Sequence, residues 1–119
     1  MFQRRERVVE LLKQEISSLV RTLKDPSLSG ILTITGLELS RDMKTARVFY
    51  SVIGTEEDRK ATAKILDRSI NYIYHQLKDR LAMRIIPFLE FKYDNTPAQA
   101  HRIEEILNRI HEEDSNKPS

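Results

Sequence analysis

The stretch ILTITGLELSRDMKTARVFYSVI, residues 31–53, decides the fold because it contains two predicted strands and the turn that joins them. Ile31–Leu39 and Thr45–Ile53 are rich in β-branched and aromatic residues, which fit the pleated surface of a sheet. The short polar link Ser40–Lys44 predicts that the two strands pair as an antiparallel hairpin. Gly36 in the middle of the first strand predicts a β-bulge or a close approach of another backbone.

A helix is predicted upstream of the hairpin, over residues 4–24. Its apolar residues recur at steps of one, three and four and therefore share one face: Val8, Leu11, Leu12, Ile16, Leu19, Val20 and Leu23. Asp25-Pro26 is expected to end this helix, because a proline ring disfavours helical backbone in the residue before it.

A second helical segment is predicted downstream of the hairpin, over residues 56–83. Thr55 is a suitable N-cap, and the acidic residues 56–58 interact favourably with the helix dipole in the first turn. One straight helix over this range would be ~40 Å long, which is more than a domain of this size accommodates. We therefore expect a break at Ser69-Ile70-Asn71, because Ser and Asn are weak helix formers.

The remaining chain is predicted to add one strand and one helix. The alternation in FLEFKY, residues 88–93, indicates the strand, and Thr96-Pro97 is typical of a helix start. Four apolar positions define an amphipathic helix over 96–112, expected to pack on or beside the domain: Ile103, Ile106, Leu107 and Ile110. Residues 113–119 are polar, and we expect a disordered tail there.

The order of these elements predicts the architecture of residues 1–95. The series α-β-β-α-α-β, with a break between the two adjacent helices, predicts an α+β fold with two layers. Three strands would form the sheet, and the helices would cover one of its faces. The other face is expected to be partly open. At 119 residues, the chain corresponds to a single domain.

The charge of the chain is unevenly distributed. Residues 1–93 contain 17 Lys and Arg against 12 Asp and Glu, whereas residues 94–119 contain 3 against 6. A basic body with an acidic end favours a polyanion such as nucleic acid as the partner, although ordinary soluble domains also show such a balance. The sequence has no cysteine and no apolar run that approaches the length of a membrane span. We therefore expect a cytoplasmic protein without a membrane partner.

The sequence offers little for an enzyme. His101, Glu104 and Glu105 share a predicted helical face, but their spacing is not that of a zinc-binding HExxH motif. Neither a phosphate-binding glycine loop nor a nucleophile motif is present. We expect no catalysis, no metal and no cofactor. The alternative is a small hydrolase that uses His101 and Glu104.

Cations gather at the start of the first predicted helix and at the tip of the predicted hairpin. Arg4, Arg5 and Arg7 begin the first helix, where the helix dipole disfavours positive charge, so they either contact phosphate or belong to a frayed, solvated end. Arg41 and Lys44 lie at the predicted hairpin tip. Either Asp42 accepts hydrogen bonds from the turn and leaves both cations for phosphate, or Arg41 pairs with Asp42 or a neighbour to hold the hairpin.

A third group of cations lies along the second helical segment. Lys60, Lys64 and Arg68 step by four and therefore form one line on the helix surface. The expected break follows directly, and a new helix N-terminus there would offer free N–H groups to a phosphate. A solvated helix face is the plainer interpretation. Tyr72 and Tyr74 offer rings for base stacking, although a Tyr near a core face is more often packed.

The whole pattern resembles ribosome-binding factor A, a bacterial family of small-subunit assembly factors. Four stretches carry the resemblance and span residues 7–107 in the same order: RVVELLKQEISSLV, LKDPSLSGILTITGLELSRDMKTARVFYSV, LAMRIIPFLEFKYDNT and HRIEEIL. The combination of KDPSL, ELSRDMKTARVFYSV and PFLEFKYDNT is specific to the family, whereas the middle helices match less closely.

The resemblance implies a type II KH-like fold without catalytic activity. Family members lack the KH-type GxxG loop, and an Ala-x-Gly sequence kinks their helix pair. The corresponding stretch of this chain is Ser69-Ile70-Asn71, which has Ser in place of the Ala and Asn in place of the Gly. We also expect that the long C-terminal tail of some members is absent.

The resemblance also implies a function. Members bind the free 30S subunit near the decoding region and the 5′ end of its 16S rRNA, during late maturation and in the cold. We expect a monomer that contacts RNA around the break, at Lys60, Lys64, Arg68, Ser69, Asn71, His75 and Lys78. Flanking phosphate contacts are expected at Arg4, Arg5, Arg7, Arg41 and Lys44. The alternative is a protein-interaction module that binds through the open sheet face or the last helix without direct RNA contact.

Overall fold

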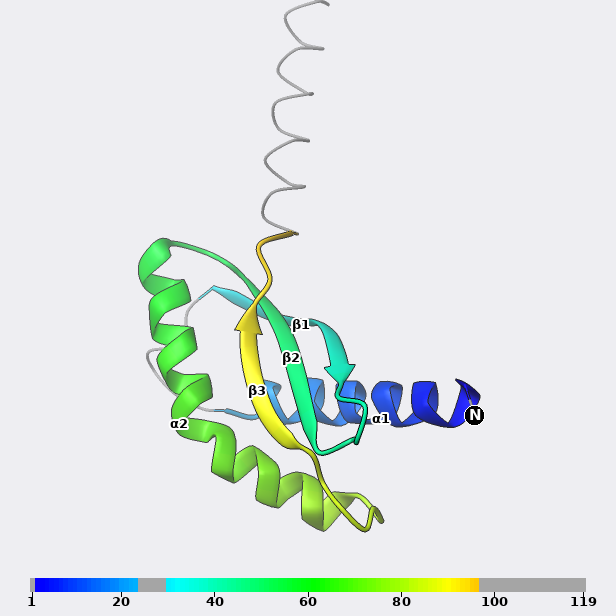
Figure 1. The fold of residues 1–119 in the computed structure, drawn as a ribbon. Coiled ribbons are helices and arrows are strands. Elements are labelled where there is room, and N and C mark those ends of the chain that lie inside the picture. The colour runs from blue at the N-terminus through cyan, green and yellow to red at the C-terminus, as the bar shows by residue number, and fades with distance from the viewer. Residues whose placement is uncertain (1, 24–29, 97–119) are drawn as a thin grey trace, which may run out of the picture.

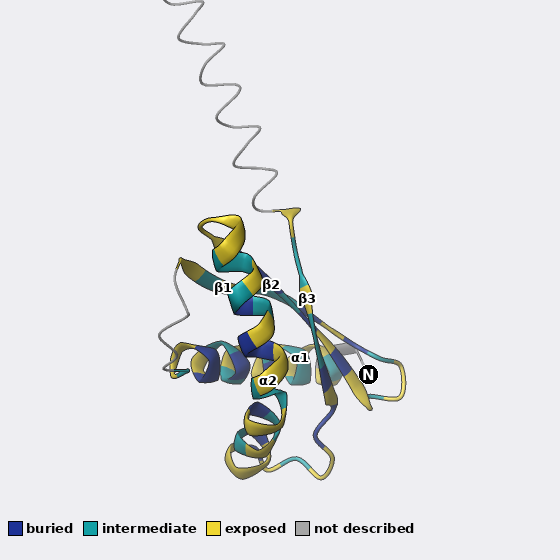
Figure 2. Cartoon of the chain, turned by 90° about the vertical axis from the view of Figure 1, so that its left-hand side faces the viewer, coloured by how far each residue is buried: buried dark blue, intermediate teal, exposed yellow. Residues whose placement is uncertain are grey.

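The computed structural model describes residues 2–23 and 30–96. Both helices lie on one face of a three-stranded sheet, as Figures 1 and 2 show, so the predicted two-layer α+β architecture is confirmed. Except for Thr96, the predicted terminal helix and tail lie outside the described residues. The elements in chain order are α1 (Phe2–Arg21), β1 (Ile31–Leu39), β2 (Thr45–Ile53), α2 (Glu56–Arg80) and β3 (Phe88–Tyr93).

The predicted hairpin is present, with its bulge at Gly36. β1 and β2 pair antiparallel, and the register shifts between Ile34 and Gly36. A Cβ atom built on Gly36 would meet nothing within 4 Å, so of the two predicted alternatives the bulge is present and the close backbone approach is not. Thr35, which has no partner in β2, is the extra residue, and it shifts the in-and-out alternation of the side chains that follow it. Leu37 and Leu39 therefore reach the same buried face as Ile34.

The third strand lies on the other side of β2 and runs parallel to it. α2 makes the crossover between these two strands, as parallel neighbours require. The buried face of β2 consists of Ala46, Val48, Tyr50 and Val52. Arg47 and Ile53 point to the opposite, outer face and are exposed. The helices therefore cover the inner face only.

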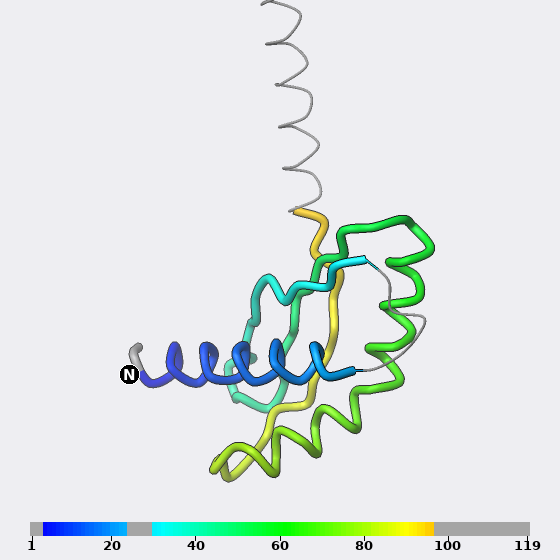
Figure 3. The backbone as a smooth tube through the Cα atoms, turned by 180° about the vertical axis from the view of Figure 1, so that it is seen from behind, coloured from blue at the N-terminus to red at the C-terminus, as the bar shows by residue number. Residues whose placement is uncertain are grey.

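Helix α1 crosses the strands on their covered face (Figure 3). Its buried residues are Leu12, Ile16, Leu19 and Val20, all within the predicted apolar face. The helix runs from Phe2 to Arg21, so both of its ends lie earlier in the chain than the ends of the predicted range, 4–24. Asp25-Pro26, the expected stop signal, lies outside the described residues.

The structure of helix α2 differs from the prediction of a break at Ser69-Ile70-Asn71. It begins at the predicted cap, where Thr55 and Asp58 form a capping box. Its hydrogen-bonded course then continues from Glu56 to Arg80, while its axis bends between the two ends (Figures 1 and 3). The expected new helix N-terminus at Ser69–Asn71 is therefore wrong, because these backbone N–H groups lie inside one continuous helix.

Candidate nucleic-acid interface

One line of exposed polar residues runs along α2, which we call the α2 stripe. Its members are separated by steps of three and four, so they share one side of the helix. The buried residues Leu66, Ile73 and Leu77 lie on roughly the opposite side at ~100° per residue, and the stripe therefore faces away from the core. Figure 2 shows the corresponding alternation of exposed and buried segments along the helix. The stripe consists of Lys60, Lys64, Arg68, Asn71, His75 and Lys78.

The positions of Ser69 and Tyr74 on α2 differ from the predicted contact region. Ser69 is half-buried and lies off the stripe, next to Arg68. Tyr74 packs against the hydrophobic core, whereas Tyr72 is 50% exposed and remains accessible for stacking. The expected contact region therefore becomes an elongated basic face rather than a phosphate pocket at a helix start.

Lys60, at the start of the α2 stripe, is only weakly held by an acidic neighbour. It lies 4.0 Å from Glu56, and both side chains are largely exposed, so this ion pair contributes little stability. Lys60, Lys64 and Arg68 line a shallow hollow of about 340 Å³ together with Glu57. Such a surface attracts a polyanion without the geometry needed to read individual bases.

The hairpin turn, Ser40–Lys44, resolves the two alternatives that the sequence leaves open. Asp42 accepts hydrogen bonds from the Ser40 hydroxyl at 2.7 Å and from the Lys44 backbone N–H at 3.0 Å. These two bonds lower the pKa of Asp42 below its ordinary value of 3.8. Arg41 and Lys44 are exposed, and among the described residues neither forms an ion pair. The carboxylate thus accepts hydrogen bonds within the turn and forms no ion pair with Arg41, while the nearby charge of Lys44 also helps to lower its pKa.

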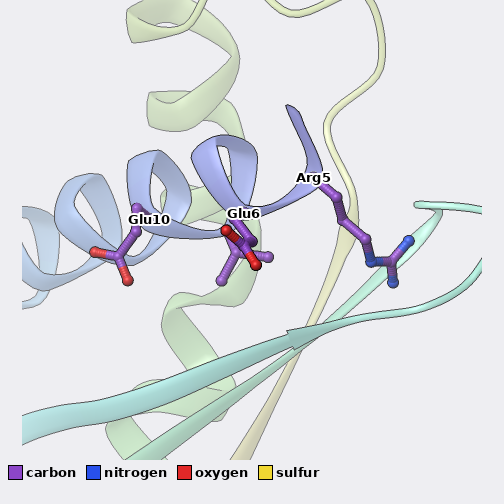
Figure 4. A pocket seen from close by; sticks show the side chains of 4 residues that line it. Arg5, Glu6 and Glu10 are labelled. Atoms are coloured by element: carbon purple, nitrogen blue, oxygen red, sulfur yellow. The ribbon is translucent and has the colours of Figure 1, made fainter. Parts of the chain in front are cut away.

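Arg5 has a different environment from the other two arginines at the start of α1. Its Nη2 atom donates hydrogen bonds to the carbonyl oxygen of Leu39 and, at 3.0 Å, to that of Ser40. In Figure 4 its side chain extends away from Glu6 and Glu10 toward the hairpin. Arg4 and Arg7 are exposed. Only Arg5 of this group therefore holds parts of the fold together.

The start of α1 also meets the segment that follows α2. Arg4, Lys44 and Arg84 surround a hollow of about 790 Å³, which we call the hairpin hollow. Val8, Met83 and Ile85 contribute apolar surface to it. Arg84 was not among the predicted site residues, because nothing in the sequence indicates that residues near 84 lie beside the hairpin.

Arg59 and Arg80 connect different elements of the fold. The Arg59 guanidinium lies 5.2 Å from the centre of the Tyr93 ring, and Nη1 donates to the Tyr93 hydroxyl at 3.4 Å. Tyr93 raises the pKa of Arg59 through this bond. Arg80 lies 3.6 Å from Glu15 and links α2 to α1. These contacts join elements of the fold, and neither Arg59 nor Arg80 belongs to the α2 stripe or lines the hairpin hollow.

Clusters of metal-ligating side chains and apolar helices of membrane length are the features that would indicate a metal site or a membrane span in the described residues. No group of three metal-ligating side chains occurs in residues 2–23 and 30–96. Within the same ranges, no helix has the length and apolarity to cross a membrane. His101, Glu104 and Glu105 lie outside the described residues.

The sequence comparison gives the family. A sequence model of ribosome-binding factor A matches residues 4–107. This chain belongs to the ribosome-binding factor A family. The relative from Desulforamulus reducens is 39% identical over 120 residues, covering 100% of this chain and 98% of that protein. The relative from Staphylococcus epidermidis is 38% identical over 112 residues, covering 93% and 96%.

Solved structures of ribosome-binding factor A share the fold. The crystal structure of the Thermus thermophilus protein gives a TM-score of 0.66 at 26% identity and covers 74% of this chain and 92% of that one. A homology model of the Thermus thermophilus protein, fitted into a cryo-EM map of its 30S complex, gives 0.62 at 26% identity, with coverage of 74% and 92%. The predicted KH-like fold is therefore confirmed.

Proposed function

We propose that this chain binds the immature small ribosomal subunit as an assembly factor, with the α2 stripe against rRNA. Family membership and the 30S complex of the Thermus thermophilus relative support the choice of partner. The single observation that carries the mode of binding is the stripe itself, whose cations face away from the core over the length of α2. The exposed cations Arg4, Arg7, Arg41 and Lys44 act as flanking phosphate contacts, whereas Arg5 donates to backbone carbonyl groups of the hairpin.

The mechanism is reversible docking rather than catalysis. Lys and Arg displace counterions from the rRNA backbone and give an affinity that falls steeply with salt. The shape of the helix and of the bound RNA sets the position, because phosphate contacts carry no sequence information. We propose that the protein acts as a monomer in the cytoplasm, during late maturation of the subunit and processing of the 16S rRNA 5′ end, with a larger role in the cold.

Co-sedimentation tests this proposal. The purified protein is centrifuged with free small subunits, large subunits or assembled ribosomes, at low and at moderate salt. We expect selective comigration with free small subunits that weakens as salt rises. Equal binding to all three particles, or no binding to competent small subunits at low salt, would contradict the proposal.

The cellular part of the proposal has its own test. In a strain that lacks the protein, unprocessed 5′ ends of 16S rRNA should accumulate in free small subunits, most strongly at low temperature. The wild-type chain should reverse this accumulation. Normal 5′ ends at every temperature would remove processing and cold adaptation from the function.

A second candidate function is a protein-interaction module. The outer face of the sheet favours it, because Ile31, Ile53 and Phe88 are each at least 60% exposed. This alternative predicts that binding to the subunit changes little with salt and survives RNase treatment.

A further inference from the structure

Three segments that are far apart in the sequence meet at the hairpin hollow. Arg4 comes from the first turn of α1, Lys44 from the β1–β2 turn, and Arg84 from the link between α2 and β3. Arg4, Lys44 and Arg84 are all exposed. A cation at the start of a helix is unfavourable to the helix dipole, so local stability does not account for Arg4.

Arg5 fixes the relative position of two of these segments. One nitrogen of its guanidinium donates to the carbonyl oxygens of Leu39 and Ser40, where β1 passes into the turn. Ser40 N donates to Thr45 O at 2.8 Å, and Thr45 N donates to the Ser40 hydroxyl at 3.0 Å, which closes the base of the turn. Phe88 N donates to Lys44 O at 2.8 Å and ties the turn to β3 as well. Arg5 therefore holds a turn that is already well defined against the start of α1.

The chemistry of the hollow fits an RNA strand. A phosphodiester backbone accepts hydrogen bonds from Arg and Lys, and riboses or bases can rest on apolar surface such as Val8, Met83 and Ile85. Ile85 is 63% exposed, so this surface is open to a partner. Asp42 also lines the hollow and accepts hydrogen bonds from Ser40 and Lys44 at its Oδ1 atom, so the cations of the hollow outnumber this one negative charge.

We propose that the hairpin hollow is a second RNA-docking surface, with Arg4, Lys44 and Arg84 as phosphate contacts and Arg5 as a positioning residue. This inference rests on the proposed function, because it takes rRNA as the partner. An acidic protein segment is the other occupant that basic and apolar groups would suit. RNA is favoured by charge, because three exposed cations line the hollow against the single carboxylate of Asp42, and Lys78 of the α2 stripe lies only six residues before Arg84 in the chain. A polymer with uniform negative charge can follow both surfaces.

The first experiment removes the two contacts outside the turn. Arg4→Gln/Arg84→Gln is compared with the wild type and with Arg21→Gln/Lys92→Gln, which removes the same charge at exposed sites outside the hollow. Binding to purified small subunits and to a single-stranded RNA oligonucleotide is measured over a salt series. We expect the hollow variant to bind about tenfold more weakly, with a salt slope smaller by about 1.4, which corresponds to two lost contacts. The control should keep the wild-type slope.

The outcomes separate this inference from the proposed function. If the wild type fails to bind small subunits, the proposed function itself is contradicted. If the wild type binds and the hollow variant matches the control, only the second surface is excluded. Weaker binding of the hollow variant to subunits, with unchanged binding to the oligonucleotide and resistance to RNase, would assign the hollow to a protein partner and overturn the RNA inference.

The second experiment tests the role of Arg5. Arg5→Lys keeps the charge but loses the guanidinium that bridges two carbonyl oxygens, whereas Arg5→Gln loses both. A positioning residue predicts that Arg5→Lys and Arg5→Gln weaken RNA binding to a similar degree and speed amide exchange in the turn. Arg5→Gln should then add less than its full effect in a Lys44→Gln background, because both act through the same turn.

A direct phosphate contact makes the opposite prediction for Arg5. Arg5→Lys would then bind like the wild type, since lysine also binds phosphate as a point charge. The effects of Arg5→Gln and Lys44→Gln would be additive. Circular dichroism of each variant shows that the binding data refer to folded protein.

Discussion

The hydroxyl of Thr35 donates a 2.8 Å hydrogen bond to the carboxylate of Asp94, although β2 separates their two strands. Thr35 lies at the register shift of β1, and Asp94 directly follows β3. By strand alternation, Asp94 points to the outer face of the sheet, with Glu90 and Lys92. The bond therefore spans β2 on that face and ties together the two edges of the sheet.

Removal of this bond should loosen the sheet at the bulge. Thr35→Val keeps the shape of the side chain and its preference for strands but cannot donate to Asp94. We expect a lower melting temperature than for Thr33→Val, a matched control on the same strand whose side chain is exposed. Equal melting temperatures of the two variants would show that the bond contributes nothing to stability.

The protonation of Asp94 reports on the same contact. Hydrogen bonds from the Thr96 backbone N–H and then from Thr35 lower the pKa of Asp94 below 3.8. The ionised carboxylate therefore adds stability that is fully present above pH 3.8 and is lost as pH falls through the lowered pKa. In Thr35→Val the pKa should rise but remain below 3.8, because the bond from Thr96 persists. NMR titration of the carboxyl carbon measures this shift, and an unchanged pKa would contradict it.

The capping box of α2 should contribute measurably to stability. Thr55 N donates to Asp58 Oδ2 at 2.8 Å, and Asp58 N donates to Thr55 Oγ1 at 3.1 Å. Thr55→Ala removes the acceptor at the start of the helix and should lower the free energy of unfolding by about 1 kcal/mol. Thr55→Ser retains that oxygen and should recover most of the loss in urea denaturation. Equal losses for the two variants would assign the effect to the methyl group instead.

The inner face of α1 should tolerate truncation far less than its neighbouring side. Leu12 is fully buried, whereas Leu11 is 40% exposed. Leu12→Ala leaves a cavity between α1 and the sheet and should cost about 2–5 kcal/mol of unfolding free energy. Leu11→Ala, the same chemical change one position away, should cost much less in the same denaturation experiment. Similar costs would mean that α1 sits differently on the sheet.

The strands were predictable because their local signals agree with the fold. The bounds of β1, β2 and β3 match the predicted ranges, since β-branched and aromatic residues are interrupted by clear turn residues. Gly36 also marked the bulge. The continuity of α2 was harder to predict: Ser69 and Asn71 weaken a helix locally, but the buried residues on either side hold one helix together. Propensity was overridden there by packing.

Some residues of the candidate site could likewise be predicted from the sequence, and others could not. The α2 stripe follows from spacing alone, because helical geometry fixes which residues share a side. The role of Arg5 could not be read from the sequence, since its partners are backbone carbonyls 34 and 35 residues away. Backbone atoms carry no sequence signature. The proximity of Arg84 to the hairpin depends on the bend and length of α2, which a linear pattern does not contain.

The salt dependence of binding to free small subunits tests the central claim most directly. The wild type is compared with Lys64→Gln/Lys78→Gln on the exposed side of α2 and with the Arg21→Gln/Lys92→Gln control of equal charge. Docking through the α2 stripe predicts that the stripe variant binds more weakly and that its slope of log affinity against log salt is smaller by about 1.4, while the control keeps the wild-type slope. Wild-type affinity and slope in the stripe variant would contradict the account.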